Sequence, residues 1–275
     1  MRLKPLLLAA CLALLPPCGV AEPGADFLAE AVASPSRTPE YRARDVYRHP
    51  EQTLRFFGIT PQMTVVEVWP GEGSYTEILA PYLRDAGHYY AAGAAASQPD
   101  ASANAVRSAA TFQAKLDADP ERYGKVTVTE FRAPDVVDIC PPGTADLVLS
   151  FDSVHNWMTV RAEQDAFNAF YRALKPGGVL GVVEHRAWPY TTIEQTRKTG
   201  YVNEEYVKAL AANAGFEFVA ASPVNANPRD KKDYPQGVWT LPPTLALGDQ
   251  DKARYLKIGE SDRMTLKFRR PAAGE

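Results

Sequence analysis

The stretch Glu67-Val68-Trp69-Pro70-Gly71-Glu72-Gly73-Ser74-Tyr75 decides the fold of this chain. It begins inside a short apolar run, residues 65–69, bounded by prolines, as is typical of a buried strand. Apolar side chains then recur at helical spacing, at Tyr75, Ile78, Leu79 and Tyr82. The pattern therefore predicts a strand that passes into a helix through a turn with two glycines.

The alternation of strand and helix continues along the chain. Short apolar runs predict further strands at 88–92, 126–131, 146–151, 179–184, 216–221 and 264–268. Helical spacing or composition predicts helices over 39–57, 102–118, 167–174 and 203–214. Strands separated by helices need crossover connections, which produce parallel pairing. We therefore expect an α/β fold with a mainly parallel sheet and helices on both faces.

The first 21 residues have the pattern of an export signal. Arg2 and Lys4 precede an apolar stretch, 6–15, that is too short to span a bilayer, and two prolines and small residues follow it. We predict a cleaved signal peptide, a helical lead-in and one domain, at 1–21, 22–60 and 61–271. The product is then expected to be periplasmic or secreted, without an integral membrane anchor.

Composition excludes some classes of partner. The chain has 275 residues, 45% of them hydrophobic, and a formal net charge of −3, which is ordinary for a globular protein. It has no long run of like charge, so we expect no nucleic-acid partner. Two of its three cysteines lie in the predicted signal peptide, which leaves Cys140 without a disulfide partner. The oligomeric state is not indicated by these features.

The predicted turn is the most informative candidate site. In open α/β sheets, ligands bind at the carboxyl ends of the strands, where helix N-termini present free N–H groups. Gly71 and Gly73 would let a ligand approach the backbone closely, although many such turns use glycine for geometry alone. An acid in the turn disfavours a pyrophosphate and suits a ligand with a positive charge, hydroxyl or amino groups.

These residues resemble the first motif of class I S-adenosylmethionine-dependent methyltransferases, acid-x-Gly-x-Gly-x-Gly, here Glu67-x-Trp69-x-Gly71-x-Gly73. The segments 146–151 and 172–178 resemble the family's fourth-strand motif and its helix-to-fifth-strand segment. The resemblance covers about residues 60 to 270. It implies a doubly wound, Rossmann-like, seven-stranded sheet with an antiparallel edge strand. Its Trp-Pro-Gly-x-Gly motif is similar to that of a bacterial group of exported predicted methyltransferases.

The resemblance implies S-adenosyl-L-methionine as the cofactor and methyl transfer to a small-molecule or envelope acceptor. The residues it implies for cofactor binding are Glu67, Trp69, Gly71, Gly73, Tyr75, Asp152 and Trp157. Two positions depart from the family. Trp69 stands in place of the first glycine, and no carboxylate stands near Gly93, where the ribose-binding acid is expected, so Asp100 or another group would have to substitute. These departures favour, as the alternative, a non-catalytic or degenerate ligand-binding module on the same fold.

Polar side chains follow the predicted fourth and fifth strands. His155 comes after the fourth strand, and Glu184 and His185 end the fifth. We predict these three as catalytic, with His185 as general base, because an imidazole titrates near neutral pH. The structural alternatives are a helix cap at Asp152 or Ser153 and a loop-fixing ion pair between Glu184 and Arg186.

A metal-assisted hydrolase or transferase that uses Asp152, His155, Glu184 and His185 is a third hypothesis. The chain has no His-x-x-x-His and no paired-cysteine spacing, so the sequence predicts no metal site.

The connection from Ser222 to Arg263 is long for a compact domain. Long ordered connections are often lids or binding loops, and we interpret the polar residues of this one as either substrate-side or structural. Tyr201 is either a residue of such a lid or a core packer.

Overall fold

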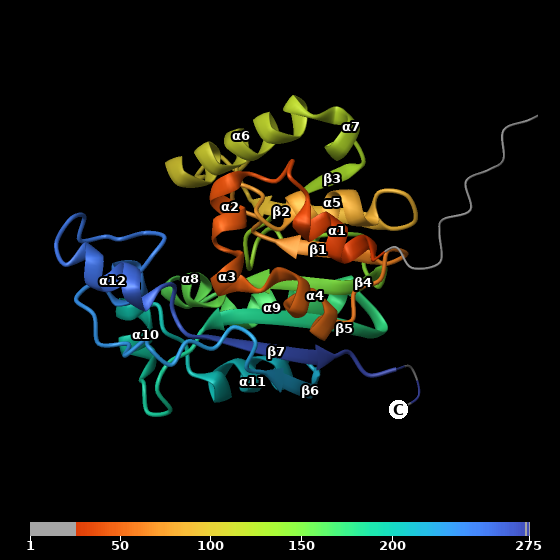
Figure 1. The fold of residues 1–275 in the computed structure, drawn as a ribbon. Coiled ribbons are helices and arrows are strands. Elements are labelled where there is room, and N and C mark those ends of the chain that lie inside the picture. Colours follow the sequence, from red (N-terminus) through yellow and green to blue (C-terminus); the bar gives the residue numbers. More distant parts are fainter. Residues whose placement is uncertain (1–25, 273, 275) are drawn as a thin grey trace, which may run out of the picture.

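The computed structural model describes residues 26–272 and 274. The predicted signal peptide, residues 1–21, lies outside the described residues. Seven strands form one sheet in the order β3-β2-β1-β4-β5-β7-β6 (Figure 1). Their bounds are β1 (Thr64–Val68), β2 (His88–Ala94), β3 (Val126–Phe131), β4 (Ala145–Phe151), β5 (Leu174–His185), β6 (Glu217–Ser222) and β7 (Arg263–Arg269).

The sheet is mainly parallel, as predicted. Strands β3, β2, β1, β4 and β5 pair in parallel, whereas β7 runs antiparallel to both β5 and β6. Strand β1 ends at Val68, one residue earlier than predicted, because Trp69 has a left-handed backbone with φ 53°. Strand β5 starts at Leu174, earlier than predicted, and residues 175–178 bulge out of its ladder with β4.

The helices are α1 (Phe27–Ala33), α2 (Pro39–Ala43), α3 (Asp45–Arg48), α4 (Pro50–Phe57), α5 (Thr76–Leu83), α6 (Ala103–Ala118), α7 (Pro120–Tyr123), α8 (Val154–Thr159), α9 (Glu163–Ala173), α10 (Ile193–Thr199), α11 (Glu204–Asn213) and α12 (Lys252–Ile258), with a 3₁₀ turn, η1 (Gly237–Thr240). The helical character predicted at 39–57 is divided among α2, α3 and α4. His49 turns left-handed, and Pro50, which has no N–H to donate, begins a new helix.

The helices cover both faces of the sheet. One apolar core joins the sheet to α8, α9 and α11, and the other joins it to α1, α4, α5 and α6 (Figure 1). No helix within the described residues is both long enough and apolar enough to cross a membrane.

The long connection between β6 and β7 is ordered around a third, smaller core. Tyr201 belongs to it, is 2% exposed, and donates its hydroxyl to the carboxylate of Asp230 at 2.9 Å. Tyr201 is therefore a core packer.

The N-terminal helices belong to the same body as the sheet. The Thr38 backbone N–H and hydroxyl donate to the buried carboxylate of Glu77 in α5, at 2.7 and 2.5 Å. Phe57, at the end of α4, packs against β5 where Gly181 leaves room for its ring. The described part of the lead-in, residues 26–60, thus packs on the domain.

Gly181→Ala tests this packing. A Cβ at Gly181 would lie 2.8 Å from the Phe57 ring, so we expect a loss of about 1–3 kcal/mol in the free energy of unfolding, measured in urea. Gly93→Ala is the matched control, because its Cβ would have Thr129 O as its nearest neighbour at 3.8 Å. Equal stability of the two variants would contradict the close contact.

Candidate functional site

The turn between β1 and α5 bends through three left-handed residues, Trp69, Gly71 and Gly73, with φ of 53°, 58° and 87°. This conformation costs a tryptophan roughly 1–2 kcal/mol, whereas glycine adopts it freely. A Cβ on Gly71 would meet no atom within 4 Å, whereas one on Gly73 would lie 3.1 Å from the Lys115 side chain. The backbone at Gly71 therefore faces open space, and that at Gly73 is covered by α6.

Glu67 lies beneath this turn and is 3% exposed. Its Oε2 accepts hydrogen bonds from the hydroxyls of Tyr89 and Thr76. Burial raises the pKa of Glu67 to about 7, although both hydrogen bonds act in the opposite direction. Half of this carboxylate thus joins α5 to β2, and Oε1 has no hydrogen-bond partner among residues 26–272. The predicted contact between Glu67 and a ligand stays a prediction, and it would have to be made by Oε1.

Two tryptophans line the edge of the sheet beside the turn. The half-buried Trp69 donates its indole N–H to the carbonyl of Phe131, at the end of β3, at 3.0 Å. Its ring packs edge-on against that of Trp157, with 5.4 Å between centroids. Trp157 is 1% exposed, and its indole N–H has no acceptor among the described residues. An unpaired buried donor costs about 1–3 kcal/mol.

An acid missed by the sequence analysis lies at the end of β2. Glu130 of β3 pairs in register with Gly93, where the family's ribose-binding acid was expected. Its carboxylate accepts from the Ser97 backbone N–H at 2.8 Å and from the Ser97 hydroxyl. Asp100, the substitute considered from sequence, is instead exposed and paired with Arg132. The only sign of Glu130 in the sequence was an acid near the end of a predicted strand. The sequence does not show which residue of β2 it pairs with.

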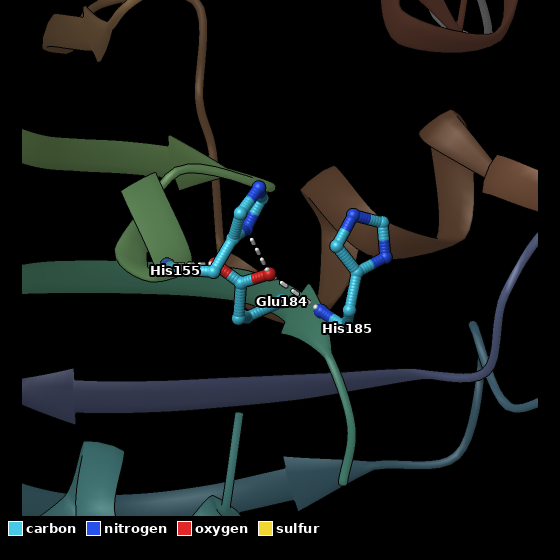
Figure 2. Close-up of side chains that lie close together, drawn as sticks. All are labelled: His155, Glu184 and His185. Carbon is cyan, nitrogen blue, oxygen red and sulfur yellow. Dashed lines mark hydrogen bonds and ion pairs between the residues drawn. The ribbon is translucent and has the colours of Figure 1, made fainter. Parts of the chain in front are cut away.

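The three residues predicted as catalytic lie together (Figure 2). Glu184 is fully buried, and its Oε1 accepts from His155 Nδ1 at 3.0 Å and from the His185 backbone N–H at 2.7 Å. Its Oε2 accepts from the His155 backbone N–H at 3.2 Å. The alternative ion pair between Glu184 and Arg186 does not form, because Arg186 binds Asp262 at 2.7 Å.

The two imidazoles differ in environment. His185 Nδ1 lies 2.5 Å from the Ser261 hydroxyl, and its Nε2 lies 4.0 Å from Asp152 Oδ1. Burial lowers the pKa of His185 to about 4, so this ring is neutral at pH 7. For His155, burial opposes the charged form, but the adjacent Glu184 carboxylate outweighs it and raises the pKa.

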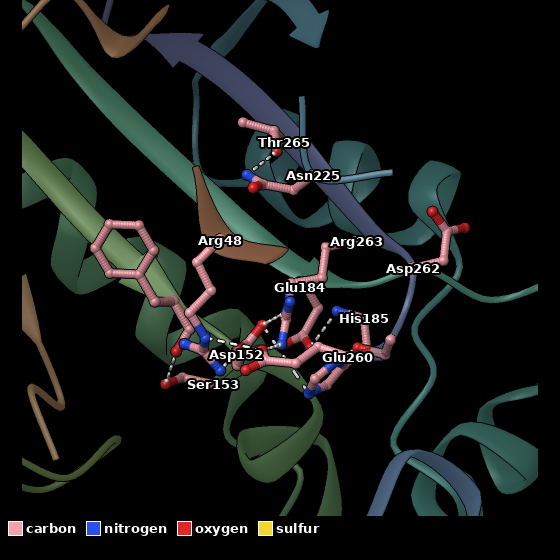
Figure 3. A network of polar contacts seen from close by, with 12 residues as sticks. Arg48, Asp152, Ser153, Glu184, His185, Asn225, Glu260, Asp262, Arg263 and Thr265 are labelled. Atoms are coloured by element: carbon pink, nitrogen blue, oxygen red, sulfur yellow. Dashed lines mark hydrogen bonds and ion pairs between the residues drawn. The ribbon is translucent and has the colours of Figure 1, made fainter. Parts of the chain in front are cut away.

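Asp152 connects the site to the N-terminal helices (Figure 3). Its carboxylate binds Arg263 Nε at 3.0 Å and Arg48 Nη2 at 3.2 Å. Burial opposes its charge, but these guanidinium groups hold the pKa of Asp152 well below its usual range. Neither predicted cap forms, since Ser153 donates its hydroxyl to the Phe151 carbonyl.

Glu260 completes the network. It accepts from Arg44 Nε at 2.6 Å, Arg48 Nε at 2.9 Å and Arg263 Nη2 at 2.5 Å. Neither Arg44 nor Arg48 is predictable from sequence as a site residue, because nothing in their helical segment indicates a long-range partner.

A small cavity of about 10 Å³ lies in this network, close to the space of one water molecule. Tyr75 lines it, 5% exposed, and stacks on Phe151 with 3.8 Å between ring centroids. Tyr75 therefore forms a wall of the site, and its predicted contact with a cofactor stays a prediction.

Comparison with known proteins agrees with this geometry. Residues 67–182 match the family model described as a methyltransferase domain, which includes the glycine turn, both tryptophans and His155. The chain has the fold of the class I methyltransferases.

Solved structures agree on the methyltransferase fold. An S-adenosylmethionine-dependent methyltransferase from Aquifex aeolicus has 16% identity over 85% of this chain and 94% of that chain, with a TM-score of 0.55. Phosphoethanolamine N-methyltransferase 2 of Haemonchus contortus, in complex with S-adenosyl-L-methionine, has 17% identity over 90% and 60%, with a TM-score of 0.53. The cyclase SpnF has 17% identity over 82% and 81%, with a TM-score of 0.57. No curated protein sequence matches the chain.

Glu67→Gln tests the buried carboxyl beneath the turn. Because folding raises its pKa from 4.5 to about 7, the protonated form is favoured in the fold, and stability falls as pH rises through that interval. We expect the variant to be more stable than the wild type by about 3 kcal/mol at about pH 8, and little changed at about pH 5, in urea unfolding. Glu72→Gln, on the exposed side of the turn, is the control. A difference that does not change with pH would contradict the assignment.

Proposed function

We propose that the protein is an S-adenosylmethionine-dependent methyltransferase that acts on a small-molecule or envelope acceptor. The observation that carries this proposal is the open backbone at Gly71, in a glycine turn at the carboxyl end of β1. This turn lies in the segment that matches the methyltransferase domain. We also propose a periplasmic or secreted location. Its two supports are the signal-peptide pattern of residues 1–21 and the Trp-Pro-Gly-x-Gly motif, which resembles that of an exported group.

The residues around the turn fit the proposed cofactor. Gly71 allows close approach of a ligand to the backbone, and the half-buried Trp69, supported from behind by Trp157, would provide an aromatic surface for a nucleobase. Glu130, whose two oxygens already accept from Ser97, would share them with the ribose hydroxyls, and Glu67 Oε1 would accept from a positively charged end. When bound, S-adenosylmethionine supplies a methyl group on a positively charged sulfur.

The chain's own contribution is alignment and exclusion of water. We assign the acceptor side to His155, Glu184 and His185, which end β5 and begin α8 beyond Asp152. Arg48 of α3 binds Asp152 and so holds the N-terminal helices against this edge of the sheet. No nucleophilic side chain is needed, because the methyl group passes directly to the acceptor.

A degenerate or non-catalytic binding module is the second candidate. The observation that favours it is the Trp69 side chain, which reaches from the end of β1 to the carbonyl at the end of β3. It therefore passes the end of β2, which lies between them in the sheet. The similarity to the cyclase SpnF also shows that this fold is not restricted to methyl transfer.

Gly71→Arg distinguishes the two candidates at the cofactor site. The wild type is expected to release heat on titration with S-adenosylmethionine at micromolar concentration, and the variant to release none, because an arginine side chain would occupy the open space. Gly143→Arg is the control, since its φ of 70° and its open surroundings match those of Gly71 at a remote position. Undiminished binding by Gly71→Arg would remove the turn from the proposal.

His185→Asn tests the acceptor side. Asparagine retains a polar atom near the position of Nδ1 for Ser261 and deletes Nε2. We expect transfer of labelled methyl groups into small-molecule or envelope extracts to fall by roughly tenfold or more, with the affinity for S-adenosylmethionine unchanged. An unchanged transfer rate would show that His185 serves packing only.

A further inference from the structure

We propose that His155 and His185, together with Asp152, bind a divalent transition-metal ion, with Glu184 and Ser261 orienting the imidazoles. This proposal goes beyond the proposed function, because metal binding requires neither the cofactor nor the methyl acceptor. The sequence only weakly indicates a metal at these residues, since the two histidines come from α8 and the end of β5, with no ligand spacing between them.

The two imidazoles converge. Ligand atoms of His155, Glu184 and His185 all lie within 4.8 Å of one another, and the two ring centroids are 5.1 Å apart. Figure 2 shows both rings on the same side of Glu184. Ligands of one zinc ion at about 2.1 Å stand roughly 3–4 Å from each other, so small side-chain rotations bring the two rings to a common ion.

Each ring is held through Nδ1 and leaves Nε2 unbonded. His155 Nδ1 donates to the Glu184 carboxylate at 3.0 Å, and His185 Nδ1 bonds the Ser261 hydroxyl at 2.5 Å. Neither Nε2 has a hydrogen-bond partner in the part of the chain that the structure describes. Metal-binding histidines commonly show this arrangement, in which a carboxylate or another polar group fixes the other ring nitrogen and orients the ring.

Asp152 supplies the oxygen ligand. Its Oδ1 lies 4.0 Å from His185 Nε2, too far for a hydrogen bond. Arg263 Nε donates to the same Oδ1 at 3.0 Å, and Arg48 Nη2 lies 3.2 Å from Oδ2, so the two guanidinium groups fix the orientation of this carboxylate. Glu184 is the less suitable ligand, because its two oxygens already accept three N–H groups.

The local charges allow a cation. The three guanidinium groups of the network, from Arg44, Arg48 and Arg263, are matched by three carboxylates, from Asp152, Glu184 and Glu260. Two imidazoles and one carboxylate form a donor set suited to zinc, cobalt, iron or manganese. An ion bound there would act as a Lewis acid at the acceptor side of the proposed methyltransferase.

The test is titration of the chelator-treated protein with Zn²⁺ in a calorimeter and with Co²⁺ in a visible spectrometer, without S-adenosylmethionine. We expect one ion per chain, and a cobalt spectrum indicating nitrogen ligation. His155→Asn and His185→Asn delete Nε2 but keep a polar atom near Nδ1, and each should weaken Zn²⁺ binding by roughly 100-fold or more. Ser261→Ala, which only releases a ring, should weaken it by roughly 10–100-fold.

His88→Asn is the matched control, because His88 is exposed at the opposite end of β2 and bonds Thr127. It should leave Zn²⁺ affinity unchanged. Unchanged affinity in folded His155→Asn and His185→Asn, or no binding by the wild type, would overturn the proposal. The heat of S-adenosylmethionine binding to the metal-free protein tests the proposed function separately. Failure of the metal proposal therefore leaves cofactor binding measurable, and failure of cofactor binding leaves metal binding measurable.

Discussion

The carboxylate of Glu260 joins the N-terminal helices to the start of β7. It is 1% exposed and binds Arg44 and Arg48 from the N-terminal helices and Arg263 from the start of β7. Arg48 and Arg263 also bind Asp152, at the end of β4. Since removal of one member of a buried ion network leaves the other charges unpaired, the network acts as a unit. The arrangement of the candidate acceptor site depends on it.

The sheet and its helices could be read from sequence because each depends on local patterning. Buried parallel strands such as β1 and β4 are short apolar runs between turn residues, and α5 shows its apolar face directly. The N-terminal helices were harder to predict from sequence. His49 and Pro50 interrupt a pattern that looks continuous, and the left-handed backbone of His49 is not indicated by its residue type.

The candidate site was predictable where it lies at strand ends and not where it depends on register or long-range partners. His155, Glu184 and His185 could be grouped because the carboxyl ends of neighbouring parallel strands meet. Glu130 beside Gly93 requires the register of β2 on β3. The partners of Asp152 lie about a hundred residues away in both directions, at Arg48 and Arg263, and no local pattern connects them.

The antiparallel direction of β7 has a consequence for how specificity can change. Because β7 starts where β5 ends, Ser261 and Arg263 enter beside His185 from a segment that contributes nothing to the glycine turn. The forty residues or so between β6 and β7 carry their own small core. Insertions or exchanges in that connection can therefore reshape the candidate acceptor site while the proposed cofactor site at the glycine turn keeps its geometry. Related chains could in this way come to accept different substrates while the proposed cofactor site stays unchanged.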